Sequence, residues 1–128
     1  MTIKVKPSGL ALGAEIIGAD LTQPLDDATF AQIRAAFYQH EVVFFRGQAL
    51  TDEDQIRFSA RFGELRKLKL ASQPFVAHPE IFVVSNIKKD GKHIGSYDAG
   101  SLWHTDGAYL AYPHAISALR ALEVPLQN

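Results

Sequence analysis

The sequence predicts an α+β domain in which two helices pack on a mainly antiparallel sheet. Two stretches in the first half of the chain carry apolar residues at helical spacing, and each begins with residues suited to capping. Short β-branched or aromatic runs, bounded by glycine and turn residues, indicate strands and are most frequent in the second half. Helices early and strands late are typical of the α+β class.

The first predicted strand lies within residues 13–21, where short apolar runs stand between glycines. A helix is expected next, capped by Asp26 or Asp27 and continuing to about His40. Apolar residues of this stretch share one helical face, which we expect to be buried. They are Phe30, Ile33 and Phe37.

A second strand and a second helix follow. Residues 42–45 read Val-Val-Phe-Phe without alternation, which is typical of a strand covered on both sides. Thr51 and Asp54 have the spacing of a capping box, in which each side chain accepts a hydrogen bond from a backbone N–H that would otherwise lack a partner. This helix is expected to end between Arg61 and Gly63, because glycine readily adopts the left-handed conformation of a helix stop.

Residues 66–78 have no clean period and are predicted to form a loop. The loop begins with the basic residues Arg66, Lys67 and Lys69, for which a solvated surface and the attraction of an anionic substrate remain alternatives. A strand is expected over residues 81–86, and Asp90-Gly91 predicts a hairpin turn.

Two further extended segments are predicted in the last part of the chain, over residues 101–106 and 115–124. They complete the expected sheet. No internal repeat or long linker divides the sequence, so residues 1–128 are expected to form a single domain.

Composition excludes several classes of function. With 13 Lys plus Arg against 14 Asp plus Glu, the chain has no basic surplus for nucleic acid. Its apolar runs are far shorter than the roughly 18 residues of a membrane span, and its first residues lack a secretory signal pattern. We therefore expect a cytoplasmic protein with no nucleic-acid or membrane partner. Because there is no cysteine, any bound metal must use histidine and carboxylate.

The most informative motif is Trp103-His104-Thr105-Asp106. On a strand, side chains two residues apart point to the same side, with their backbones about 7 Å apart. His104 and Asp106 would thus supply two ligands of a 2-His-1-carboxylate site, which suits non-haem Fe(II). An isolated His-x-Asp occurs often by chance, so a surface turn or a plain hydrogen-bonded pair is the alternative.

The surroundings of this motif resemble the taurine dioxygenase (TauD/TfdA) family in order and spacing. The resemblance is carried by Gly13-Ala14-Glu15-Ile16-Ile17-Gly18-Ala19-Asp20-Leu21, His40-Glu41-Val42-Val43-Phe44-Phe45-Arg46-Gly47-Gln48, Arg61-Phe62-Gly63-Glu64-Leu65, Trp103-His104-Thr105-Asp106 and residues 113–125. It implies a jelly-roll, or double-stranded β-helix, core. It also implies an oxygenase that uses Fe(II) as cofactor and 2-oxoglutarate as co-substrate, releases succinate and carbon dioxide, and hydroxylates a small substrate, often organosulfur or anionic.

The same resemblance implies roles for individual residues. His104 and Asp106 correspond to iron ligands, and Tyr109 to an aromatic residue that faces the substrate. Core packing is the alternative role for Tyr109. This chain has other residues where the taurine-specific enzymes have an asparagine, a histidine and a tyrosine that hold the substrate, so taurine is not the expected substrate. The residues of this chain at those positions are Gly100 in place of the asparagine, Leu68 in place of the histidine and Ala71 in place of the tyrosine.

The family's later elements have no counterpart in these 128 residues: a threonine and an arginine that bind 2-oxoglutarate, and the second iron-binding histidine. His114 would have to reach back across Tyr112-Pro113 to replace that histidine, and a loop position is the favoured interpretation. His40 suits a helix end, while His78 and His93 are expected to face solvent. We therefore expect the N-terminal half of a dioxygenase.

An incomplete jelly roll would leave sheet edges uncovered, which predicts a homo-oligomer, such as a strand-exchanged dimer, or a separate chain that supplies the rest. Two other functions remain open. The chain is alternatively a truncated, non-catalytic remnant acting as a binding or oligomerisation module, or a cupin-like protein that holds zinc or manganese through His104 and Asp106.

Overall fold

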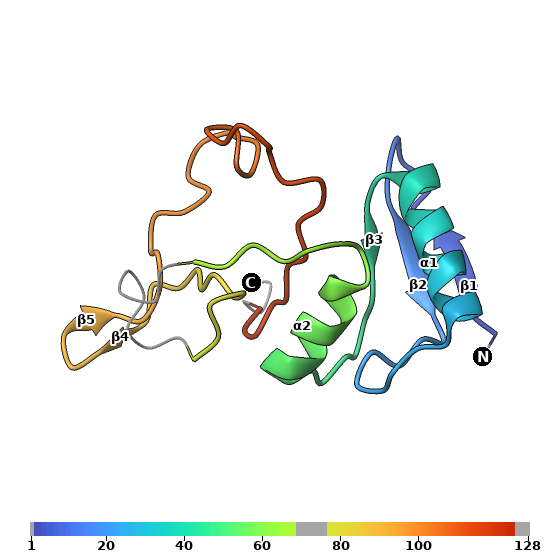
Figure 1. Ribbon diagram of the computed structural model, residues 1–128, viewed down its shortest axis with the longest axis horizontal. Coiled ribbons are helices and arrows are strands. Elements are labelled where there is room, and N and C mark those ends of the chain that lie inside the picture. Colours follow the sequence, from blue (N-terminus) through green and yellow to red (C-terminus); the bar gives the residue numbers. More distant parts are fainter. Residues whose placement is uncertain (1, 69–76, 125–128) are drawn as a thin grey trace. The chain divides into compact units, whose positions relative to one another are not determined.

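The computed structural model describes residues 2–68 and 77–124. The chain divides into two compact units, Met1–Phe58 and Ser59–Asn128, which are described separately. Most of the regular secondary structure of the described residues lies in the first unit (Figure 1). The candidate site lies in the second.

The first unit contains a three-stranded sheet in the order β1, β2, β3. Strand β2 (Ala14–Ile17) pairs antiparallel with β1 (Lys4–Pro7) and parallel with β3 (Val43–Phe44). The strands predicted over residues 13–21 and 42–45 are present but shorter. This sheet is mixed rather than mainly antiparallel, because the helix after β2 carries the chain back to run beside β2 in the same direction.

Strand β1 was not predicted from the sequence. Its residues are mostly exposed, and proline ends it, so it lacks the apolar run that marks a covered strand. Its backbone pairing with β2 gives it order: Lys4 lies opposite Ile17 and Pro7 opposite Ala14. Pairing between strands is a tertiary property that side-chain pattern reports only weakly.

Helix α1 (Asp27–His40) covers one face of this sheet (Figure 1). Asp26 is the N-cap: its carboxylate accepts hydrogen bonds from the Thr29 amide at 2.7 Å and the Thr29 hydroxyl at 2.8 Å. These bonds lower the pKa of Asp26 to about 2. The predicted apolar face is confirmed, since Phe30 and Ile33 are buried and Phe37 is half-buried.

Helix α2 (Asp52–Ala60) begins with the predicted capping box. The Asp54 amide donates to the Thr51 hydroxyl at 3.1 Å, and the Thr51 amide donates to the Asp54 carboxylate at 3.0 Å. The helix ends at Ala60, within a residue of the prediction. Phe58 packs edge-on against Phe30 and Phe45, with ring centroids 6.3 and 5.6 Å away. The helix therefore contributes to the core of the first unit.

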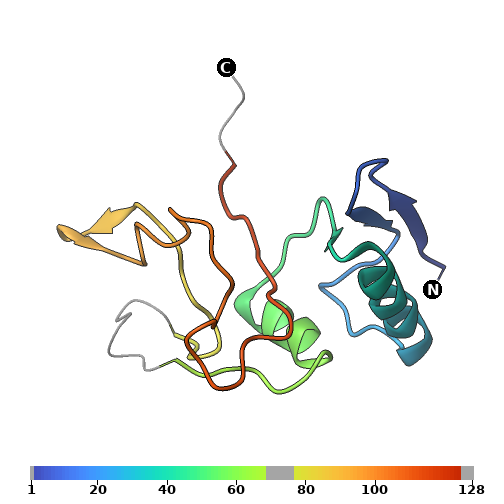
Figure 2. The ribbon, with the colours of Figure 1, turned by 90° about the horizontal axis from the view of Figure 1, so that it is seen from above.

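The described part of the second unit consists mainly of loops around one hairpin, β4 (Lys88–Lys89) and β5 (Lys92–His93) (Figure 2). The turn forms where it was predicted. Asp90 and Gly91 both have positive φ, 51° and 77°, as the tight turn requires. The strand expected over residues 81–86 is reduced to a single bridge between Val84 and Ser96.

The extended segments predicted over residues 101–106 and 115–124 are not strands: no ladder pairs the described residues of either segment. A strand requires a neighbouring backbone to satisfy its N–H and C=O groups, and the sequence pattern cannot supply that neighbour. His78 and His93, expected to face solvent, are half-buried, and His93 stacks on Tyr97 with ring centroids 4.4 Å apart.

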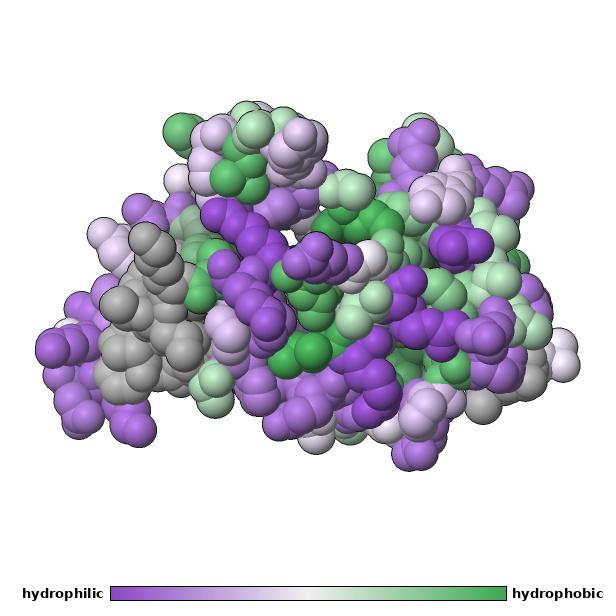
Figure 3. Space-filling model, in the orientation of Figure 1, coloured by the Kyte–Doolittle hydropathy of each residue, from purple (hydrophilic) through white to green (hydrophobic). Residues whose placement is uncertain are grey.

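Several described residues expose large apolar side chains to solvent. On the face drawn in Figure 3, apolar areas lie among polar ones. No helix among the described residues is long and apolar enough to cross a membrane. The jelly-roll core implied by the resemblance is not formed by the described residues.

Candidate metal centre

The two predicted metal ligands lie together, although not on a strand. Residues 103–105 have no regular structure, and a turn follows in which the Ala108 amide donates to the Thr105 carbonyl at 3.2 Å. Nε2 of His104 lies 3.3 Å from Oδ1 of Asp106. The two side chains thus lie close together, as predicted, but on irregular backbone that leads into a turn rather than on a strand.

The His104 ring is oriented by the backbone. Its Nδ1 lies 2.7 Å from the carbonyl oxygen of Leu102, and because a carbonyl only accepts, Nδ1 must donate. In the neutral ring Nε2 then carries a lone pair that faces the Asp106 carboxylate. Two acceptors at this distance require a cation between them, either a proton on Nε2 or a metal ion. A backbone carbonyl on Nδ1 is the usual outer contact of a metal-binding histidine.

The carboxylate of Asp106 has a second partner. The Ser117 hydroxyl donates to Oδ2 at 2.5 Å, which leaves Oδ1 directed toward His104. This hydrogen bond is the main cause that lowers the pKa of Asp106, with burial opposing it and the neighbouring imidazoles of His104 and His114 adding to it. The charged form of the Asp106 carboxylate therefore persists to lower pH than that of an ordinary aspartate.

The separation of the two atoms fits a shared metal ion. Nitrogen and oxygen ligands lie about 2.0–2.2 Å from a divalent ion such as zinc, so two ligands at a right angle lie about 3 Å apart. No group of three His, Cys, Asp or Glu side chains within residues 2–68 and 77–124 is arranged to hold a metal. The described residues thus offer two candidate ligands, one fewer than a 2-His-1-carboxylate site requires.

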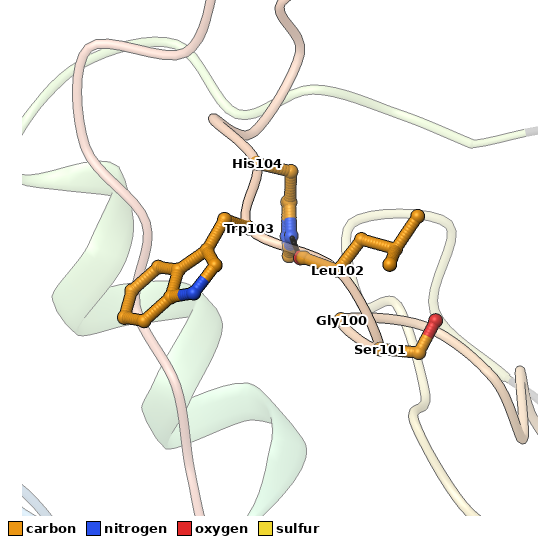
Figure 4. Close-up of a pocket in the computed structure, with 5 residues that line it drawn as sticks. All are labelled: Gly100, Ser101, Leu102, Trp103 and His104. Atoms are coloured by element: carbon orange, nitrogen blue, oxygen red, sulfur yellow. Dashed lines mark hydrogen bonds between the residues drawn. The ribbon is translucent and has the colours of Figure 1, made fainter.

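A shallow pocket of about 450 Å³ borders His104. It is lined by residues 100–104, and Figure 4 shows the Trp103 indole turned away from the side chains of Ser101 and Leu102. Gly100, one of the positions that differ from the taurine-specific enzymes, lines this pocket. Leu68 donates its amide to the Pro79 carbonyl at 2.7 Å, and Ala71 lies outside the described residues.

Tyr109 does not pack in a core, because 79% of its surface is exposed. Its hydroxyl accepts a hydrogen bond from Nη1 of Arg66 at 3.1 Å, and the Arg66 guanidinium lies 5.6 Å from the centre of its ring. The same Nη1 lies 3.1 Å from Nε2 of His114. Because arginine has no acceptor, Nε2 of His114 must accept this bond, which commits that atom to Arg66 rather than to a metal.

Gly107 explains how His114 comes close to the turn. Gly107 is buried, with φ of +68°, and a Cβ there would lie 3.0 Å from Cδ2 and 3.2 Å from Cγ of the His114 ring. Only glycine accepts both the backbone conformation and this close approach.

Sequence reasoning missed the supporting residues of the site. Ser117 lies eleven positions from Asp106, and Arg66 lies 43 positions from Tyr109, so no local pattern connects them. The basic cluster at the start of the predicted loop was the one available signal for Arg66. No signal in the sequence pointed to Ser117 or to the Leu102 carbonyl.

A histidine and a carboxylate lie side by side here, and each side chain is oriented by a further hydrogen bond, an arrangement compatible with part of a non-haem iron site. Residues 4–127 match the family sequence model described as "Taurine catabolism dioxygenase TauD, TfdA family". The chain belongs to this family. Its members are dioxygenases that use Fe(II) and 2-oxoglutarate, also called alpha-ketoglutarate.

Two relatives illustrate the range of the family. The (S)-phenoxypropionate/alpha-ketoglutarate-dioxygenase of Delftia acidovorans is 34% identical over 120 residues, covering 85% of this chain and 38% of the relative. The alpha-ketoglutarate-dependent sulfate ester dioxygenase of Pseudomonas putida is 37% identical over 131 residues, covering 98% of this chain and 39% of the relative. The chain therefore spans about two fifths of the length of these relatives.

Among solved structures, a putative alpha-ketoglutarate-dependent taurine dioxygenase from Burkholderia xenovorans is similar to this chain, with a TM-score of 0.61 and 43% sequence identity. The match covers 69% of this chain and 32% of that one. The helices and small sheets described above are consistent with part of the TauD fold.

Proposed function

We propose that this chain contributes two iron ligands, His104 and Asp106, to an Fe(II)- and 2-oxoglutarate-dependent oxygenase. The observation that carries the proposal is the convergence of Nε2 and Oδ1 at 3.3 Å, with Nδ1 committed to the Leu102 carbonyl. In the neutral ring this pairing would aim a nitrogen lone pair and a carboxylate oxygen at one position, and these are two of the three donors of a 2-His-1-carboxylate Fe(II) site.

The residues have distinct parts in this function. The Leu102 carbonyl selects the histidine tautomer that can bind metal, and the Ser117 hydroxyl orients the Asp106 carboxylate. When bound, Fe(II) supplies the oxygen chemistry that couples conversion of 2-oxoglutarate to succinate and carbon dioxide with hydroxylation of the substrate. The exposed face of Tyr109, beside the same turn, is proposed to contact the substrate.

The proposed substrate is a small anionic or organosulfur molecule. Support comes from the relatives, since one is described as acting on (S)-phenoxypropionate and another on sulfate esters, both of which are anions. The absence from this chain of the three residues that distinguish the taurine-specific enzymes argues against taurine itself.

Metal binding tests the proposal directly. Mn(II), a redox-stable stand-in for Fe(II), is titrated into the chain, and free Mn(II) is followed by electron paramagnetic resonance. His104→Ala and Asp106→Ala should each weaken binding by about tenfold or more, since each removes one of two protein ligands. His40→Ala is the matched control, because His40 ends helix α1 in the other unit.

Equal Mn(II) affinity in the original chain and in His104→Ala would contradict the proposal. Activity is measured separately, as succinate formed from 2-oxoglutarate under oxygen after addition of Fe(II). Preferential retention of zinc by protein purified without added metal would instead favour the cupin-like alternative.

A further inference from the structure

A cluster of three side chains, Arg66, Tyr109 and His114, lies beside the proposed metal ligands and is called here the Arg66 cluster. Nη1 of Arg66 contacts both the Tyr109 hydroxyl and Nε2 of His114 at 3.1 Å. These contacts join the start of the loop after helix α2 to the segment that carries Asp106. They bring a permanent positive charge close to the predicted metal ligands. The sequence alone had identified no positively charged group at this site.

The two hydrogen bonds use only one end of the guanidinium. A guanidinium has five N–H donors in one plane, and the two on Nη1 point to Tyr109 and His114. Nε and Nη2 of Arg66 have no hydrogen-bond partner among the described residues, and no carboxylate there pairs with Arg66. Three N–H donors therefore remain, in the fork arrangement that binds two oxygens of an oxyanion.

The neighbouring lysine behaves differently. Nζ of Lys67 lies 3.8 Å from Oε1 of Glu80, so its charge already has a partner on the protein. The basic cluster seen in the sequence is thus divided: Lys67 forms a surface ion pair, while Arg66 is directed toward Tyr109 and His114. Lys69, the third residue of that cluster, lies outside the described residues.

The Arg66 cluster is tied to the metal ligands through the turn. The His114 ring sits on Gly107, the residue that follows Asp106, and Tyr109 lies three positions beyond Asp106. A substrate held by Arg66 would therefore lie close to the turn that carries Asp106, with the exposed Tyr109 ring available for its apolar part.

We propose that Arg66 binds the anionic group of the substrate through Nε and Nη2, with Tyr109 and His114 holding the guanidinium in place. The ligand chemistry is an oxyanion: a carboxylate, sulfate or sulfonate on a small organic molecule. This inference rests on the proposed function, which supplies the neighbouring oxidation site. It assigns Arg66 a role in substrate specificity and His114 a positioning role in place of metal binding.

Calorimetric titration without added metal tests this assignment. The probes are (S)-phenoxypropionate, hexyl sulfate and 2-oxoglutarate, and the uncharged methyl ester of phenoxypropionate is the ligand control. Arg66→Gln should weaken binding of the first two probes by roughly 10- to 100-fold, the loss expected for charge-assisted hydrogen bonds. Arg66→Lys should recover part of it, because lysine keeps the charge but lacks the fork.

Lys67→Gln is the matched control, since it removes a charge from the adjacent position and should leave probe affinity unchanged. Tyr109→Phe is the second variant: it keeps the ring but removes the acceptor for Nη1, and a loss of severalfold is expected. Circular dichroism of each variant establishes that it is folded, and Arg66→Lys with Tyr109→Phe carries the test if Arg66→Gln does not fold.

Three results would overturn the assignment: no binding of either organic anion by the original chain, equal binding by Arg66→Gln, or equal losses in Arg66→Gln and Lys67→Gln. A loss confined to 2-oxoglutarate would show that Arg66 serves the co-substrate, and would also overturn it. Because the titration contains no metal, these failures are distinct from a failure of His104 and Asp106 to bind Mn(II).

Discussion

The Ser117 hydroxyl donates a hydrogen bond to Oδ2 of Asp106 at 2.5 Å, across eleven positions of the chain. This contact directs the other carboxylate oxygen, Oδ1, toward His104 and lowers the pKa of Asp106. A hydroxyl that no sequence motif marks thus orients a proposed metal ligand and extends its charged form to lower pH.

Removal of this hydroxyl should weaken metal binding. In Ser117→Ala we expect Mn(II) affinity to fall by about 10- to 100-fold, as for other outer partners of metal ligands, and Ser117→Thr should retain most of it. Ser59→Ala, on helix α2, is the control.

Because the hydrogen bond lowers the pKa of Asp106, metal binding in Ser117→Ala should also be lost at a higher pH than in the original chain as the solution is acidified. Titrations of Mn(II) between neutral and acidic pH measure both effects, and coincident pH profiles would contradict this role.

Gly107→Ala should disturb the second unit through two costs. The positive φ of +68° strains any residue with a side chain, by about 1–2 kcal/mol, and the new Cβ must also displace His114. Gly91→Ala is the matched control, since Gly91 has φ of +77° in the same unit but nothing within 4 Å of its Cβ position. Urea denaturation should show a larger loss for Gly107→Ala, and equal losses would mean that His114 does not rest on this residue.

Asp26→Ala should lower the melting temperature at neutral pH by a few degrees, because it removes the N-cap of helix α1. The pKa of Asp26 is lowered to about 2, so its contribution is present above the unfolded value near 3.9 and is lost as pH falls through about 2. The difference in melting temperature between the two proteins should therefore shrink in strong acid. Asp26→Asn keeps an accepting oxygen and should retain much of the cap; a pH-independent difference for Asp26→Ala would contradict the charge-based account.

Ile33→Ala should destabilise the first unit by about 2–5 kcal/mol, because Ile33 is a fully buried side chain on helix α1. Ile33→Val removes a single methylene and should cost about 0.5–1.5 kcal/mol. Arg34→Ala, at the next and exposed position, is the control. Urea denaturation followed by circular dichroism measures all three, and a cost for Ile33→Ala no larger than that for Arg34→Ala would contradict the assignment of Ile33 to the core.

Local signals in the sequence predicted the elements that depend on local physics. The Asp26 cap, the capping box of Thr51 and Asp54, and the turn at Asp90 and Gly91 each form where expected, because their interactions span three or four residues. The apolar face of helix α1 followed from its period for the same reason.

The strands were predicted less well, because each needs a partner that lies elsewhere in the chain. Strand β1 was missed, β3 pairs parallel to β2, and the segments over residues 101–106 and 115–124 are unpaired among the described residues. The spacing of His104 and Asp106 predicted their proximity correctly, although the two residues lie on irregular backbone and the start of a turn rather than on a strand.

The sequence by itself determined the family, the two proposed metal ligands and the helices with their caps, since all of these are written in short stretches of chain. Only the tertiary structure decided the contacts of Ser117 with Asp106 and of Arg66 with Tyr109 and His114. Those contacts join residues 11 to 48 positions apart, and they form because the folded backbone, rather than any local pattern, brings the donors and acceptors within hydrogen-bonding distance.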